Sequence, residues 1–261
     1  MEDEAAVVTL RAHAKLTRSL RITGVRPDGY HLIDAEMVSL DLHDVLTIDP
    51  SGDGLAASGP FAAGIPLDGS NLAARALAIT GRTAHITLDK HIPHGGGLGG
   101  GSTDAASALR WGGFGCTDED LVRASQLGAD IPFCLVGGRA RVRGIGEIVD
   151  PLPHVDATVT LIVPPLAVST PAAYRAWDEL GGPTADGPND LEAAALVVEP
   201  TLRWWQRAIS DRVGKPPTLA GSGATWFVEG EHSDALTDLV DEGATVVVAR
   251  TVPMDVASEL P

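Results

Sequence analysis

The feature that most limits how this chain can fold is a glycine tract at residues 95–101, where six of seven positions are glycine. Glycine loses more conformational freedom on folding than any other residue, so an ordered tract of this kind normally has a function. Without Cβ atoms, successive backbone N–H groups can approach an anion closely. The tract leads into an alanine-rich helix predicted from Thr103 to about Trp111, whose N-terminal amides add a positive end. This combination predicts a polyphosphate-binding loop.

Other classes of glycine loop fit the tract less well. No Gly-Lys-Ser/Thr closes it, so it is not a Walker A loop. Gly95, Gly97 and Gly100 match the dinucleotide fingerprint, with Asp120 about twenty residues further on. The acidic residue of that fingerprint ends a second strand, whereas Asp120 lies in the first turn of a helix predicted to begin at Thr117 with a capping box. We therefore reject a dinucleotide site. A plain glycine hinge is the structural alternative, and the well-patterned flanks argue against it.

The charge of the chain limits its partners. A formal net charge of −16 disfavours binding to nucleic acid or to an anionic membrane, since both require a basic surface. Residues 1–4 lack the regions of a signal peptide, and no window approaches 18 consecutive apolar residues. Cys116 and Cys134 form no CxxC pair. We expect a soluble, cytoplasmic protein, a monomer or homodimer, with a small-molecule substrate.

The secondary-structure signals mix strands and short helices without regular βαβ alternation, which favours an α+β fold over a doubly wound sheet. Expected strands are 7–11, 19–25, 35–48 with a break near 43–44, 84–89, 157–163, 225–229 and 244–248, with a hairpin at 139–149. Expected helices are 71–80, 103–111, one from 117, 131–134, one capped by Thr170, 189–198, 200–213 and 234–240. Residues 50–69 lack useful periodicity and are expected to form a surface excursion. Prolines cluster at 150–153, which predicts two domains, 1–152 and 153–261.

The run from Pro93 to Ala106 resembles the second signature of the GHMP kinases, the superfamily of galactokinase and of homoserine, mevalonate and phosphomevalonate kinases. Each further match is weak alone, but together their order and spacing are specific. These further motifs are Ala12-His-Ala-Lys15-Leu-Thr17, Arg26-Pro-Asp-Gly-Tyr-His31, Leu127-Gly-Ala-Asp-Ile-Pro-Phe133, Gly144-Ile-Gly-Glu147, Pro188-Asn-Asp-Leu191 and Gly221-Ser-Gly-Ala-Thr225. The run from Lys90 to Gly101 is most similar to the branch that acts on a cytidine-diphosphate-linked polyol.

The resemblance implies a two-domain α+β kinase fold, with an N-terminal ATP domain like ribosomal protein S5 and a C-terminal ferredoxin-like α/β sandwich. It implies ATP as the phosphoryl donor and Mg²⁺ that arrives with the nucleotide near Ser102. The implied ATP-binding residues are Pro93, Gly95, Gly96, Gly97, Leu98, Gly99, Gly100, Gly101, Ser102, Thr103 and Asn71. Asn71 could equally be a plain helix N-cap. His91 and His94 lack acidic or cysteine partners at ligand spacing, so we expect no zinc there.

Two charged residues are expected to carry the chemistry. In phosphoryl transfer to an alcohol, the attacking hydroxyl must lose its proton. The resemblance implies that Asp130 is the base, although the residues alone equally allow it to cap the short helix that contains Pro132. Lys15, one of only three lysines in the chain, is expected to orient Asp130 and stabilise the developing alkoxide. The alternative for Lys15 is a solvated lysine at the end of a strand.

The two tyrosines of the chain, Tyr30 and Tyr174, are candidates for binding the substrate base. The resemblance implies that they sandwich a cytosine, a stacking worth about 1–3 kcal/mol per base, while His31 bonds to the edge of the base. Ordinary half-buried packing is the alternative for each tyrosine. The further substrate-binding residues implied are Thr17, Thr170, Gly221 and Ser222.

The resemblance therefore implies that MgATP phosphorylates the 2-hydroxyl of a cytidine-diphosphate-linked methylerythritol, in non-mevalonate isoprenoid precursor synthesis. Two alternatives stay open: a GHMP kinase for homoserine or mevalonate, and a catalytically silent binding protein of the same fold. Thr17 and His13 stand where the first signature usually has asparagine and proline. The motif therefore leaves the contact to the polyol open.

Overall fold

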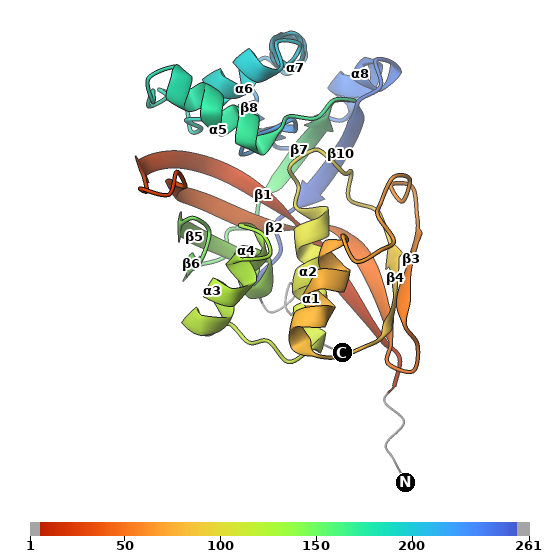
Figure 1. Cartoon of the computed structure of the whole chain (residues 1–261). Coiled ribbons are helices and arrows are strands. Elements are labelled where there is room, and N and C mark those ends of the chain that lie inside the picture. The colour runs from red at the N-terminus through yellow and green to blue at the C-terminus, as the bar shows by residue number, and fades with distance from the viewer. Residues whose placement is uncertain (1–5, 255–261) are drawn as a thin grey trace.

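The computed structural model describes residues 6–254. The prediction that residues 1–4 form no signal peptide concerns a segment outside this range. Two sheets form the framework (Figure 1). The first has the order β3-β4-β2-β5-β6, with β1 paired to β2, and consists of β1 (Val8–Val25), β2 (His31–Asp49), β3 (Gly54–Ser58), β4 (His85–Asp89), β5 (Arg139–Gly144) and β6 (Ile148–Leu152). The second has the order β10-β7-β9-β8 and consists of β7 (Thr158–Val163), β8 (Thr218–Leu219), β9 (Trp226–Glu229) and β10 (Thr245–Arg250).

Helices cover each sheet, and Figure 1 shows the two groups at opposite ends of the molecule. The first group is α1 (Leu72–Thr80), α2 (Gly100–Trp111), α3 (Asp118–Ser125) and α4 (Ile131–Val136). The second group is α5 (Thr170–Glu179), α6 (Glu192–Val198), α7 (Leu202–Val213), the 3₁₀ turn η1 (Asp234–Leu236) and α8 (Thr237–Asp241). Each group shares a hydrophobic core with its sheet, and a third core, with Leu16, Leu40, Leu161 and Phe227, joins the two sheets. This is the α+β arrangement that the sequence predicts.

The ribbon of β1 and β2 differs most from the sequence-based expectation. The split of β1 into 7–11 and 19–25 was wrong, because one strand runs from Val8 to Val25, and β2 continues through residues 43–44. Residues 12–17 are all buried, since helices cover one face of the ribbon and the second sheet covers the other. A strand buried on both faces loses the alternation that identifies a strand in sequence. A register shift between His13 and Lys15 disturbs the pattern further.

Smaller differences also have local causes. The helix expected from Thr103 begins at Gly100, inside the glycine tract. The excursion 50–69 contains β3, which pairs in parallel with β4. Ser169, not Thr170, caps α5, because the Ser169 hydroxyl accepts the amide of Ala172. The predicted caps of α1 and α3 are confirmed, with Asn71 and Thr117 each accepting a first-turn amide.

Two neighbouring polar residues tie the halves of the chain together. Asn189 and Asp190 lie beside β1, where Leu20 N donates to Pro188 O and Asp190 N donates to Leu20 O. The buried carboxylate of Asp190 accepts from Arg21 and from the amide of Ile22. Because residues of α5 and α6 also join the core of the first sheet, the division into 1–152 and 153–261 stays a prediction.

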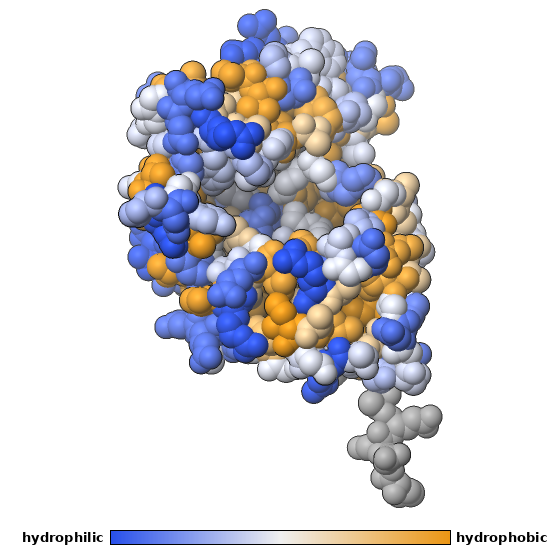
Figure 2. Space-filling view, viewed as in Figure 1, coloured by the Kyte–Doolittle hydropathy of each residue, from blue (hydrophilic) through white to orange (hydrophobic). Residues whose placement is uncertain are grey.

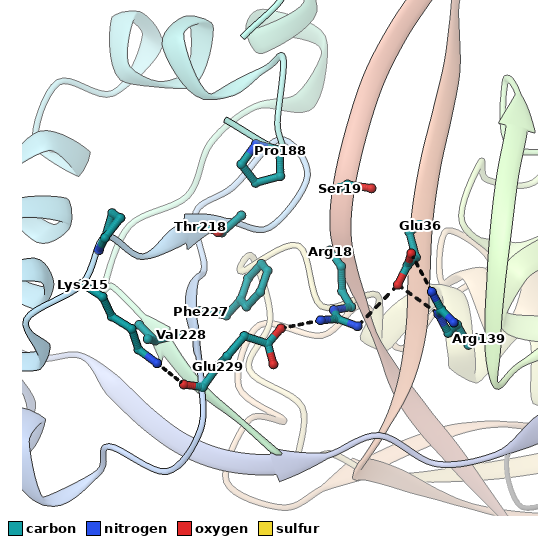
Figure 3. A pocket seen from close by; sticks show the side chains of 11 residues that line it. Arg18, Ser19, Glu36, Arg139, Pro188, Lys215, Thr218, Phe227, Val228 and Glu229 are labelled. Atoms are coloured by element: carbon teal, nitrogen blue, oxygen red, sulfur yellow. Dashed lines mark hydrogen bonds and ion pairs between the residues drawn. The ribbon is translucent and has the colours of Figure 1, made fainter. Parts of the chain in front are cut away.

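A chain of ion pairs joins the sheets a second time. Arg18 of β1 reaches Glu229 of β9 at 2.6 Å and Glu36 of β2 at 3.4 Å, and Arg139 of β5 also binds Glu36 (Figure 3). These residues line a cavity of about 490 Å³. Its side-chain charges are paired with one another, apart from Lys215, which donates to a backbone carbonyl. Among the described residues, Lys215 is therefore the charged side chain of this lining whose contact is a neutral carbonyl and not an opposite charge.

We predict that Asn189→Ala destabilises the protein by about 1–3 kcal/mol, the cost of leaving buried polar groups without partners. The amide of Asn189 donates to the carbonyls of Leu219 and Gly221 at 2.8 and 2.7 Å, and both bonds disappear in the variant. Denaturant unfolding measures the change, with the exposed Asp186→Ala as control, expected within about 0.5 kcal/mol of the parent. Equal stability of the two variants would contradict the role of Asn189.

Candidate active site

A cavity of about 860 Å³ lies between the two groups of elements, and Figure 2 shows this face of the molecule hollowed between them. It receives side chains from β1, the turn before β2, the segment before α4, α5 and the turn after β8. The sequence-predicted site residues that line it are Lys15, Thr17, Tyr30, His31, Gly97, Ser102, Asp130, Thr170, Tyr174, Gly221 and Ser222. Together with the glycine loop and the start of α2, which supply Gly97 and Ser102, six segments separated along the chain therefore meet in one place.

The centre of the cavity is an ion pair between Lys15 and Asp130, with 3.1 Å between Nζ and Oδ2. Lys15 is buried, while the Asp130 side chain is one-third exposed to the cavity. Lys15 also donates to the hydroxyl of Thr17 at 3.2 Å. Asp130 occupies the N-cap position of α4, as the alternative interpretation predicted, but its side chain makes no capping hydrogen bond and instead pairs with Lys15. A solvated strand-end position for Lys15 is contradicted by its burial.

The glycine tract packs directly on this lysine. Lys15 N donates to Leu98 O at 3.0 Å. Gly99 has φ +75°, and a Cβ there would lie 2.6 Å from Cγ of Lys15. Gly97 has φ +77°, and a Cβ there would lie 2.7 Å from Gly223 O in the turn after β8. Only glycine permits both contacts, so the tract is a fitted loop and not a hinge.

Helix α2 points its N-terminus into this region, with Ser102 lining the cavity. The first amides of a helix have no intrahelical partner and carry a partial positive charge, which together favour an anion. Thr103, in contrast, is buried, and its amide is bonded to Gly99 O, so of this Ser-Thr pair only Ser102 reaches the cavity. Leu98 is likewise buried in the third core. The geometry thus fits phosphate at residues 97–102.

Asn71 lies outside the cavity lining. Its Oδ1 accepts the amide of Ala73 at 2.8 Å and its Nδ2 donates to Pro66 O at 2.8 Å. Both polar ends of the side chain are therefore engaged in capping α1 and fixing the preceding loop. A contact of Asn71 with ATP stays a prediction.

A buried ionic cluster that the sequence analysis missed lies behind the loop. Lys90 Nζ lies between the carboxylates of Asp44 and Asp104, and all three side chains are almost fully buried. The second oxygen of Asp44 accepts the amides of His91 and Ile92. Lys90 precedes the glycine tract and Asp104 follows it, so this cluster holds both ends of the loop. Two signals in the sequence pointed to Lys90: the scarcity of lysine in the chain and its place at the start of the run from Lys90 to Gly101.

The charges within this cluster do not balance, because two carboxylates face one ammonium. Burial would lower the pKa of Lys90, but Asp104 and Asp44 outweigh that effect and raise it. Burial raises the pKa of Asp104 to about 7, although Lys90 opposes the shift. The remaining oxygen of Asp104, Oδ1, has no partner within residues 6–254. Lys90 is thus the cation that makes two buried acids tolerable.

The far end of the cavity is aromatic. The ring of His31 lies against Tyr174, with centroids 4.7 Å apart, and edge-on to Trp177 at 5.6 Å. Burial raises the pKa of Tyr174 to about 12, and the nearby charge of Asp130 adds to the shift. Tyr30 is 59% exposed and extends from the turn before β2. Two tyrosines thus border one cavity, with the ring of Tyr30 largely in solvent.

Comparison with known proteins agrees with this geometry. Residues 70–138 match the family model described as the GHMP kinases N terminal domain. A mevalonate kinase of Methanococcus jannaschii has the same fold, with TM-score 0.61, 13% identity and coverage of 95% of this chain and 99% of that one. The fold is thus that of a two-domain GHMP kinase, as the sequence predicts.

Proteins with higher sequence identity identify the family within the GHMP kinases. A 4-diphosphocytidyl-2-C-methyl-D-erythritol kinase of Paracoccus denitrificans is 40% identical over 235 residues, covering 83% of this chain and 84% of that protein. One of Cereibacter sphaeroides is 37% identical over 247 residues, covering 83% and 87%. A crystal structure of 4-(cytidine 5'-diphospho)-2C-methyl-D-erythritol kinase matches with TM-score 0.74 and 28% identity, covering 93% and 98%. The chain belongs to the 4-diphosphocytidyl-2-C-methyl-D-erythritol kinase family.

No helix within residues 6–254 combines the length and apolar character needed to cross a membrane.

We predict that Lys90→Met lowers the free energy of unfolding by about 3–5 kcal/mol, because removal of one partner of a buried ion pair leaves an uncompensated charge. Two buried carboxylates would then face each other without a cation. Denaturant unfolding at neutral pH measures the loss. The matched control is Lys215→Met at an exposed lysine, expected within about 0.5 kcal/mol of the parent. A similar small change in Lys90→Met would show that the cluster contributes little.

Proposed function

We propose that this protein transfers the γ-phosphoryl group of ATP to the 2-hydroxyl of 4-diphosphocytidyl-2-C-methyl-D-erythritol. The observation that carries the proposal is the Lys15–Asp130 pair, which lies in a cavity bounded by a glycine loop on one side and aromatic side chains on the other. A charge pair placed between a phosphate site and an aromatic site suits transfer from one nucleotide to another. The family relatives named above support the same acceptor. Because this acceptor is a free water-soluble nucleotide, we place the reaction in the cytoplasm.

In this mechanism Asp130 accepts the proton of the substrate hydroxyl as its oxygen attacks phosphorus. Lys15 holds Asp130 at 3.1 Å and stabilises the negative charge that develops on the attacking oxygen. Thr17, bonded to Lys15, takes the position of the usual asparagine and contacts the polyol. The hydroxyls of Thr170 and Ser222 lie 2.8 Å apart at one side of the cavity, and both bind the substrate there. Positioning and charge stabilisation are what phosphoryl transfer requires of a protein.

The residues of the glycine loop fit the phosphate groups of a nucleoside triphosphate. Because residues 97 and 99 are glycines, the backbone of the loop can approach the phosphate groups closely. The first amides of α2 supply hydrogen-bond donors and a positive helix end to the same groups. Ser102 is the hydroxyl best placed to meet Mg²⁺, which usually keeps several waters and binds mainly through phosphate oxygens. MgATP, when bound, supplies the phosphoryl group and neutralises charge on its oxygens.

A direct test measures ADP release by the purified protein with MgATP and three acceptors: 4-diphosphocytidyl-2-C-methyl-D-erythritol, homoserine and mevalonate. We expect turnover with the first acceptor alone. Turnover with homoserine or mevalonate alone would overturn the cytidine assignment and retain the kinase. Absence of turnover with all three would favour the silent binding protein.

We predict that Asp130→Asn and Lys15→Ala each reduce kcat at least about a hundredfold, because each removes a charge that acts in the transition state. Asp130→Asn should keep a melting temperature close to the parent, since the Asp130 side chain is partly exposed and makes no capping bond, whereas Lys15→Ala removes a buried side chain and should lower the melting temperature. Steady-state kinetics and thermal unfolding measure the two effects. Near-parental kcat in Asp130→Asn would remove this residue from the mechanism.

A further inference from the structure

The side chain of His31, the first residue of β2, is held in place by contacts on several sides. Its side chain is 9% exposed, and its ring packs against Tyr174 and Trp177 of α5. One ring nitrogen, Nε2, lies 2.9 Å from Oδ1 of Asp178, one turn beyond Tyr174 on the same helix. His31 therefore has a fixed ring position and a fixed partner.

The partner of Nε2 decides which nitrogen carries the proton. A carboxylate only accepts hydrogen bonds, so Nε2 must be the donor in this contact. In the neutral imidazole the other nitrogen, Nδ1, then carries a lone pair and accepts. Within residues 6–254 no protein atom is hydrogen-bonded to Nδ1 of His31, and the residue lines the cavity. The side chain thus offers an unused acceptor on an immobilised ring.

We propose that Asp178 is a positioning residue that fixes this tautomer of His31, so that Nδ1 selects cytosine over uracil at the exocyclic 4-position. The inference rests on the proposed function. Cytosine carries an amino group at that position and can donate to Nδ1. Uracil carries a carbonyl oxygen there, which would face the lone pair of Nδ1 with no hydrogen between them. A site built to bond one polar group rejects the analogue that lacks it, because its own polar atom is left without a partner.

The surroundings of Asp178 are consistent with this role. Its carboxylate is 48% exposed, so it is not needed to fill the core, and it also lines the cavity. Its position one turn after Tyr174 places the acid and the ring that packs on His31 on the same helix face. Helix α5 therefore both immobilises the imidazole of His31 and determines which of its ring nitrogens carries the proton.

The test compares cytidine-diphosphate-linked and uridine-diphosphate-linked methylerythritol as acceptors for the full chain and for Asp178→Ala. We expect Asp178→Ala to lower kcat/KM for the cytidine substrate about tenfold, through KM, with kcat and the KM for ATP unchanged. The preference for cytidine over uridine should fall in parallel. Asp178→Asn, whose amide oxygen can still accept from Nε2–H, should retain part of the preference. Glu179→Ala, the adjacent exposed acid, is the matched control and should behave like the parent.

Nitrogen-15 NMR of the histidines provides a readout that does not depend on activity, with the His31 signals assigned by His31→Asn. In the neutral form we expect a protonated Nε2 and an unprotonated Nδ1 in the parent, and a mixture in Asp178→Ala. A protonated Nδ1 with a bare Nε2 in the parent would overturn the proposal. Equal losses with both acceptors in Asp178→Ala would do so as well, since that is the result of a merely structural contact. If the parent phosphorylates neither acceptor, the proposed function fails, while the nitrogen signals still decide the tautomer.

Discussion

The burial of Lys15 is the constraint on which the rest of the site depends. A lysine ammonium inside a protein is stable only with partners, and Asp130 and Thr17 supply them. The aliphatic part of the side chain is covered by the backbone of Gly99, where any Cβ would collide with it. One residue therefore fixes the position of the acid, the hydroxyl and the phosphate loop at the same time. Displacement of any one of these groups would disturb the other two.

Helix α2 has two opposite electrostatic environments at its N-terminal end. Ser102 faces the cavity, where the free amides favour negative charge. Two residues later, Asp104 faces the core and brings negative charge close behind the same amides. Lys90 compensates part of that charge, while Asp44, the second acid that pairs with Lys90, binds the amides of His91 and Ile92 at the start of the loop. The loop is thus backed by a buried cation that does not line the cavity.

The local chemistry of the sequence predicted the glycine loop, the caps at Asn71 and Thr117 and the α+β class, because those features depend on neighbouring residues. Family resemblance was needed to bring Lys15 and Asp130 together, since nothing local relates positions so distant in sequence. The continuous β1 was missed because residues 12–17 are buried on both faces and show no alternation. The Lys90 cluster and the Asp178–His31 contact were missed for a different reason. Each depends on contacts between separate elements, which the local sequence does not reveal.

The long ribbon of β1 and β2 carries both ends of the proposed substrate site. Lys15 and Thr17 belong to its middle, while Tyr30 and His31 lie at its tip, and the two strands stay paired between these points, with register shifts after Thr17 and after Ile22. A ribbon of this kind fixes the distance between its middle and its tip. Its length, and not only the chemistry at each end, sets how far apart a recognised base and a reacting hydroxyl must be. Acceptors with a shorter linkage between the two could occupy one end at a time and would be left unphosphorylated.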